Sequence, residues 1–222
     1  MPKRKNPWIQ VFYYSIVLII IFGVYYMLQA QDFNLTSIIV KAMTNAGMFM
    51  VGQSLFIGPL GKFWDRFDKY IHYRKMLGVL GYYYLLLHAV FAMILYVLPR
   101  GTYSSLTVFS LGFGLTGLFL FHFCTEISNI DTIRSMGANA WRRTLRYLSY
   151  TGFISGLIHI ITARWSKEWE PYLTESQEMF ALPPLSLLVS IFAAIVLSLR
   201  LYTFLYDISP LTKPEPKPAK KK

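Results

Sequence analysis

Two histidines inside apolar stretches are the residues of this chain best placed to do chemistry. His88 follows YRKMLGVLGYYYLLL and His159 follows YLSYTGFISGLI. An ionisable side chain at membrane depth is costly, so it indicates a functional site. His88 lies 14 residues after Arg74 and His159 lies 13 residues after Arg146. At 1.5 Å per helical residue, both histidines are predicted to lie roughly 20 Å from the same membrane boundary.

Each histidine also has a glycine seven residues before it, on the same face of a helix: Gly81 and Gly152, with Gly156 as a third. A glycine face leaves room for a flat macrocycle or lets another helix come close. Two neutral imidazoles at one depth, with space between them, are what bis-histidine ligation of a haem iron requires. A zinc site would need four ligands, and the other two are missing at that level. The alternative is that the histidines and glycines serve only helix packing and hydrogen bonding.

The elements that must position the histidines are apolar segments long enough to span a membrane. The chain has 222 residues and a hydrophobic content of 55%, too apolar for an ordinary soluble domain. About 20 apolar residues cross a bilayer. The fold class predicted is an all-α polytopic membrane protein with six transmembrane helices. They cover residues 8–29, 36–60, 75–98, 105–126, 144–165 and 180–206, and the second is expected to end at a Gly58-Pro59 break.

Basic residues lie in clusters beside alternate connections of these spans. They occur at Lys3–Lys5, Lys62–Lys75, Arg134–Arg146 and Lys213–Lys222, whereas the other connections hold only Arg100, Arg164 and Lys167. The positive-inside rule then predicts that both termini are cytoplasmic. Residues 1–7 form a short N-terminus and residues 8–206 the transmembrane domain. Residues 207–222 are expected to be a disordered basic tail, which either touches anionic lipid headgroups or is only a solvated anchor.

Several other classes of protein are disfavoured. The net charge of +11 is explained by the topology clusters, which argues against nucleic-acid binding. Cys124 is the only cysteine, so no intramolecular disulfide can form. His72 and His122 do not share the depth of His88 and are not assigned as ligands. Arg74 and Arg146, with Arg142 and Arg143, either contact haem propionates, a flavin or a quinone, or serve only as positive-inside anchors.

Two segments resemble the ferric reductase-like transmembrane domain family, six-helix haem b proteins that include NADPH oxidases. They are YRKMLG followed by LLLH, and SNIDTIRSMGANAWRRTLRYLSY followed by GLIH. Within that family the chain is most similar to the haem-binding membrane subunits of bacterial methionine sulfoxide reductase systems. The resemblance covers about residues 40–165. It implies that His88 and His159 are the axial ligands of one haem b. The positions of the family's inner histidines hold Arg74 and Arg146, which stay protonated and cannot bind iron, and this argues against a second, inner haem.

The resemblance implies a subunit of the bacterial inner membrane that transfers electrons. Its donor would be a cytoplasmic flavin reductase or membrane quinol, and its acceptor a periplasmic reductase such as methionine sulfoxide reductase. Few residues follow the last predicted span and no G-x-G-x-x-G motif is present, so a separate donor is expected, with FMN or a quinone to bridge the distance. Whether the chain is a complete enzyme stays open. The alternatives are a stand-alone ferric reductase, and a haem-free transporter or assembly factor.

Overall fold

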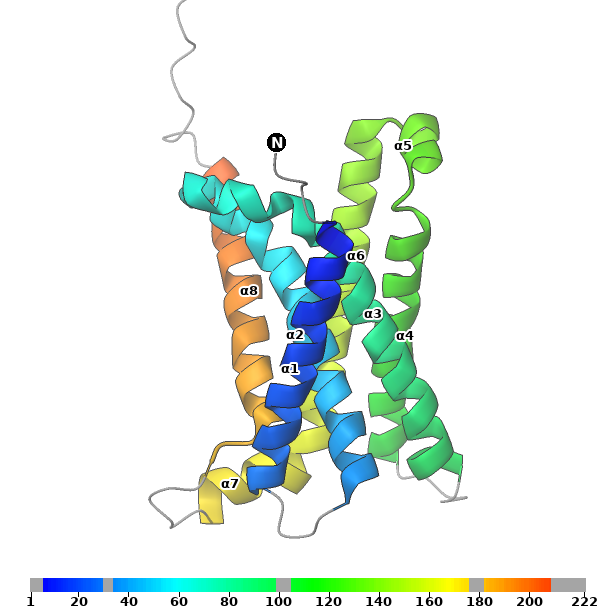
Figure 1. Cartoon of the computed structure of the whole chain (residues 1–222), viewed down its shortest axis with the longest axis vertical. Coiled ribbons are helices and arrows are strands. Elements are labelled where there is room, and N and C mark those ends of the chain that lie inside the picture. The colour runs from blue at the N-terminus through cyan, green and yellow to red at the C-terminus, as the bar shows by residue number, and fades with distance from the viewer. Residues whose placement is uncertain (1–5, 30–33, 99–104, 176–181, 209–222) are drawn as a thin grey trace, which may run out of the picture.

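The structure is a computed structural model that describes residues 6–29, 34–98, 105–175 and 182–208. The regular structure in these ranges is entirely helical. Figure 1 shows the long helices side by side, with two short helices, α5 and α7, at opposite ends of the molecule. The long helices are α1 (Pro7–Gln29), α2 (Leu35–Phe63), α3 (Arg74–Ala92), α4 (Ser105–Glu126), α6 (Ala138–Arg164) and α8 (Leu185–Ile208). The short ones are α5 (Ile130–Met136) and α7 (Glu170–Glu175).

Five of the long helices are long and apolar enough to cross a membrane: α1, α2, α3, α4 and α8. These five agree with five of the six predicted spans. The remaining predicted span, residues 144–165, lies in α6. Tyrosine, serine, threonine and histidine interrupt the apolar residues of this helix, so it falls short of the hydropathy that the other five reach. The chain is therefore an all-helical protein of multi-pass membrane character.

Two closely packed helix pairs carry the two histidines. α2 is the most buried of the five apolar helices and packs most extensively against α3, while α4 packs most extensively against α6. α1 and α8 add to the outside of α2. Contacts between α3 and α4 and between α2 and α6 are far fewer. We call the space between the α2–α3 pair and the α4–α6 pair the seam.

Glycines allow the close approach within each pair. A Cβ atom built on Gly81 of α3 would lie 2.8 Å from the carbonyl oxygen of Gly47 on α2. Between α4 and α6, a Cβ atom on Gly117 would lie 3.0 Å from the carbonyl oxygen of Gly152. Neither contact leaves room for a methyl group, so small residues are what let these backbones meet.

Replacing Gly81 with alanine is expected to lower the thermal unfolding midpoint of the purified protein in detergent. The new methyl group must push α3 away from α2, at a cost of about 1–3 kcal/mol. Gly23→Ala in α1 is the matched control, because nothing lies within 4 Å of a Cβ atom there. Equal midpoints for the two variants would contradict this account of the α2–α3 contact.

The predicted break at Gly58-Pro59 is wrong, because α2 continues through Pro59 to Phe63. Proline has no N–H, so the carbonyl four residues earlier, that of Leu55, loses its helical donor. The hydroxyl of Tyr150 on α6 donates to that carbonyl at 3.3 Å. A side chain from another helix thus satisfies the freed backbone group, as the interior of a membrane protein requires.

Two helix boundaries also differ from those predicted. α3 ends at Ala92 and is followed by a π-helical turn, η2 (Met93–Val97), while the basic connection before it forms a 3₁₀ helix, η1 (Asp65–Tyr73). α8 reaches Ile208, beyond the predicted end of its span. The basic residues predicted to fix the topology at 1–5, at Arg100 and in 209–222 lie outside the described residues.

Candidate functional site

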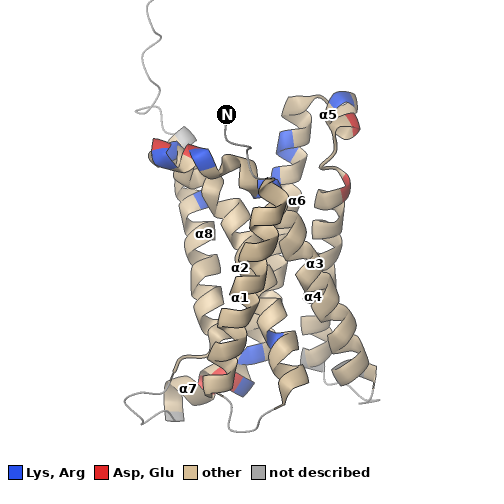
Figure 2. Ribbon diagram, viewed as in Figure 1, with Lys and Arg blue, Asp and Glu red and all other residues tan. Residues whose placement is uncertain are grey.

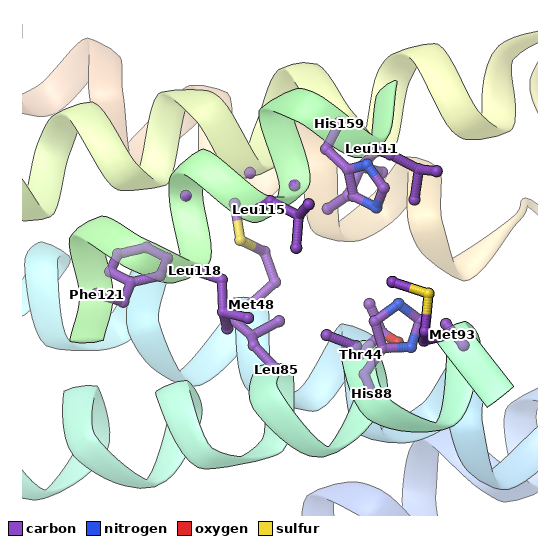
Figure 3. A pocket seen from close by; sticks show the side chains of 16 residues that line it. Thr44, Met48, Leu85, His88, Met93, Leu111, Leu115, Leu118, Phe121 and His159 are labelled. Carbon is purple, nitrogen blue, oxygen red and sulfur yellow. The ribbon is translucent and has the colours of Figure 1, made fainter. Parts of the chain in front are cut away.

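A mostly apolar cavity lies in the seam, and both histidines line it. Its volume is about 140 Å³, and it is partly open to the outside of the bundle. Figure 3 shows the rings of His88, on α3, and His159, on α6, pointing into this space from opposite sides. The apolar lining comes from α2, α3, η2, α4 and α6, and includes Met48, Leu85, Ala89, Met93, Leu111, Leu115, Leu118 and Phe121.

The His159 ring is oriented by the backbone of α4. Its Nδ1 atom lies 2.8 Å from the carbonyl oxygen of Ser110 and 3.1 Å from the Ser110 hydroxyl. Only a protonated Nδ1 can donate to a carbonyl, so this contact selects the tautomer in which Nε2 carries a free lone pair. A hydrogen bond of this kind is how proteins orient histidines that bind metals.

The His88 ring lies at the opposite wall, near the end of α3. Its Nδ1 atom is buried and has no hydrogen-bond partner among the described residues. An unpaired buried polar atom is costly and needs an explanation. The backbone of Val40 on α2 interacts with this imidazole and fixes it against α2.

The three predicted glycines lie in different places. Gly156 lines the cavity, but Gly81 and Gly152 do not. They lie at the α2–α3 and α4–α6 contacts, where each approaches a neighbouring backbone. A glycine seven residues before a histidine is on the same face of the helix but about 10 Å away along its axis. At that distance Gly81 and Gly152 lie where their helices touch a neighbour, and not beside the imidazoles.

Gly114 of α4 is a site residue that the sequence analysis missed. A Cβ atom there would lie 3.0 Å from Nδ1 of His159 and 3.2 Å from its Cε1. Glycine at this position therefore makes room for the imidazole itself. Because it comes from a third helix, no spacing relative to either histidine could have identified it.

The structure separates the four predicted arginines into two groups. Arg74 is half-buried against α2, where its Nε donates to the carbonyl oxygen of Ser54 at 3.0 Å. Arg142 is exposed and binds its own helix, with Nε donating to the carbonyl oxygen of Ala138 at 3.1 Å. Arg143 is exposed as well. Arg146 is exposed too, and none of the four lines the histidine cavity.

A charged network lies next to the cavity, at the end of α6. Glu168, in the π-helical turn η4 (Trp165–Trp169), pairs with Arg164 at 2.7 Å and with Lys41 of α2 at 3.7 Å. Its second oxygen accepts a hydrogen bond from the Ser186 hydroxyl of α8 at 2.8 Å. The network fixes this end of α6 to α2 and α8, and it explains why a lysine occurs inside an otherwise apolar helix.

The other two histidines lie away from the cavity. His122 is exposed on α4, and its Nδ1 lies 3.1 Å from the Tyr82 hydroxyl. His72 is exposed in η1 and stacks on Tyr73. Among the described residues, no group of three or more histidine, cysteine, aspartate or glutamate side chains could hold a metal ion. The two imidazoles that line the cavity lie on opposite sides of a mostly apolar space.

Comparison with known proteins adds no identification. The sequence matches no family model, and no curated protein matches it.

Proposed function

We propose that this chain is a haem b protein that transfers electrons within a membrane. The observation that carries the proposal is the pair of imidazoles, from α3 and α6, facing one apolar cavity. Haem would supply a one-electron iron couple at that place. The resemblance to the ferric reductase-like transmembrane domain family, and to the membrane subunits of methionine sulfoxide reductase systems, points to the same class.

In this proposal the chain's own side chains do three things. His88 and His159 would both bind the iron, and ligation by two histidines favours electron transfer over substrate activation. The Ser110 carbonyl keeps the binding nitrogen of His159 free. The apolar side chains around the cavity exclude water, which stabilises the cofactor by burying its macrocycle.

The proposed membrane arrangement counts α6 as a sixth span. Its 27 residues make it about 40 Å long, and it runs beside α4 (Figure 1). Lysines and arginines gather at the end of the bundle where the described chain begins, and a smaller group lies near α7 at the other end (Figure 2). Under the positive-inside rule the first end is cytoplasmic, with both termini, in a bacterial inner membrane.

The direction of transfer follows from this arrangement. The histidines lie roughly 20 Å along their helices from Arg74 and Arg146, which places them in the outer half of the membrane. Electrons would come from a cytoplasmic flavin reductase or from quinol, and leave to a periplasmic acceptor such as a methionine sulfoxide reductase. FMN or a quinone is the proposed bridge on the inner side.

The test is the pyridine haemochrome spectrum and haem content of the purified full chain, produced with ample haem supply. We expect a b-type spectrum and about one haem per chain. A folded, monodisperse protein that contains no haem would overturn the proposal.

A further inference from the structure

A second group of polar side chains lies away from the histidine cavity, among α2, α3, α6 and α8. It consists of Arg74, Arg146, Tyr150 and Arg200, and we call it the arginine cluster. Arg74 begins α3, and Arg200 lies two turns before the end of α8. The cluster is therefore near the end of the bundle where most lysines and arginines gather (Figure 2).

Two consecutive carbonyl groups of α2 organise this cluster. The carbonyl oxygen of Ser54 accepts a hydrogen bond from Nε of Arg74 at 3.0 Å, and that of Leu55 accepts one from the Tyr150 hydroxyl at 3.3 Å. The Ser54 hydroxyl donates in turn to the carbonyl oxygen of Arg74 at 2.7 Å. α2 thus holds an arginine of α3 and a tyrosine of α6 beside each other.

The other two arginines gather around the same tyrosine. The guanidinium carbon of Arg200 lies 5.6 Å from the centre of the Tyr150 ring, within range of a cation–π interaction. Arg146 lies four residues before Tyr150 on α6 and so shares its face. All three arginines are close enough to act electrostatically on the Tyr150 hydroxyl. The guanidinium groups of Arg74 and Arg200 therefore lie beside Tyr150, and Arg146 lies on the same face of α6.

The charge of this cluster is not neutralised by any carboxylate whose side chain the structure describes. Among the residues that the structure describes, no carboxylate forms an ion pair with Arg74, Arg146 or Arg200. The position of Arg74 is also built into the fold, since a Cβ atom on Gly58 would lie 3.1 Å from its guanidinium carbon. Like charges held together at the edge of a low-dielectric region repel, and a bound anion would relieve that repulsion.

We propose that the arginine cluster binds a phosphate group. A guanidinium presents a planar fork of donors that matches two oxygens of a phosphate, and a phosphate has enough oxygens to accept from more than one fork. A carboxylate, with one charge and two oxygens, would satisfy only part of the cluster. The phosphate belongs either to an anionic lipid headgroup or to a soluble phosphate compound. This inference does not depend on haem.

The experiment measures binding of two probes to the purified full chain at constant ionic strength. Inorganic phosphate is titrated calorimetrically in uncharged detergent. Phosphatidylglycerol, with phosphatidylcholine as the neutral reference, is counted by native mass spectrometry. The variants are Arg200→Gln and Arg146→Gln, and Arg142→Gln is the control, because it removes an equal charge one turn away on α6, outside the cluster. Arg146 is exposed, so its variant is expected to fold.

We expect Arg200→Gln and Arg146→Gln each to weaken binding about tenfold, the usual loss for one charge-assisted hydrogen bond, while Arg142→Gln changes it little. Loss of phosphatidylglycerol binding alone identifies a lipid site, and loss of inorganic phosphate binding identifies a site for soluble phosphates. The inference is overturned if wild-type protein binds neither probe, or if all three variants bind like wild type.

Discussion

Replacing either His88 or His159 with alanine is expected to reduce bound haem from about one per chain to nearly none. In the proposed function each imidazole would supply one ligand to the iron, and the rest of the cavity wall is mostly apolar. The measurement is haem content by pyridine haemochrome, normalised to protein, after size-exclusion chromatography.

His122→Ala and His72→Ala are the matched controls for these two variants, since both side chains are exposed and lie outside the cavity. They are expected to keep the haem content of the wild type. If His88→Ala or His159→Ala retains full occupancy, the corresponding residue is not a ligand.

A valine at Gly114 is expected to produce a loss of haem nearly as large, although this residue is not a ligand. Its Cβ atom would lie 3.0 Å from Nδ1 of His159, where the hydrogen bond to the Ser110 carbonyl holds the ring. The branched side chain must displace that ring and also fill part of the cavity. The measurement is haem content together with the thermal unfolding midpoint of the haem-free protein.

Gly112→Val is the control for the Gly114 variant, because Gly112 is on the same helix and nothing lies within 4 Å of its Cβ position. It is expected to bind haem as wild type does. Haem loss in both variants, or in neither, would mean that Gly114 does not make room for His159.

The positions of five membrane-spanning helices and the similar depth of the two histidines could be predicted from the sequence. Long apolar runs must be buried or face lipid, so hydropathy alone located the five helices that the structure makes long and apolar enough to span a membrane. The spacing of His88 and His159 from basic residues placed them at similar depth, and in the structure they line one cavity. The depth of each histidine follows from the rise per residue of a helix, and this calculation needs no knowledge of how the helices pack.

What the sequence could not supply was the pairing of helices. The side chains and backbones that meet Gly81 and Gly152 belong to α2 and α4, and no periodicity within a single helix reveals which neighbour it contacts. For the same reason the sequence did not identify Gly114 of α4 as part of the histidine cavity, or Arg200 of α8 as part of the arginine cluster. Pro59 was expected to end a helix, and only the Tyr150 hydroxyl from α6 explains why α2 continues.

We propose that two imidazoles bind one iron in the seam. The low-temperature electron paramagnetic resonance spectrum of the oxidised, haem-loaded protein tests this directly. Two histidine ligands predict a low-spin ferric signal that accounts for all the haem. A high-spin ferric signal as the main species would show that at most one imidazole binds the iron, and would contradict this assignment of His88 and His159.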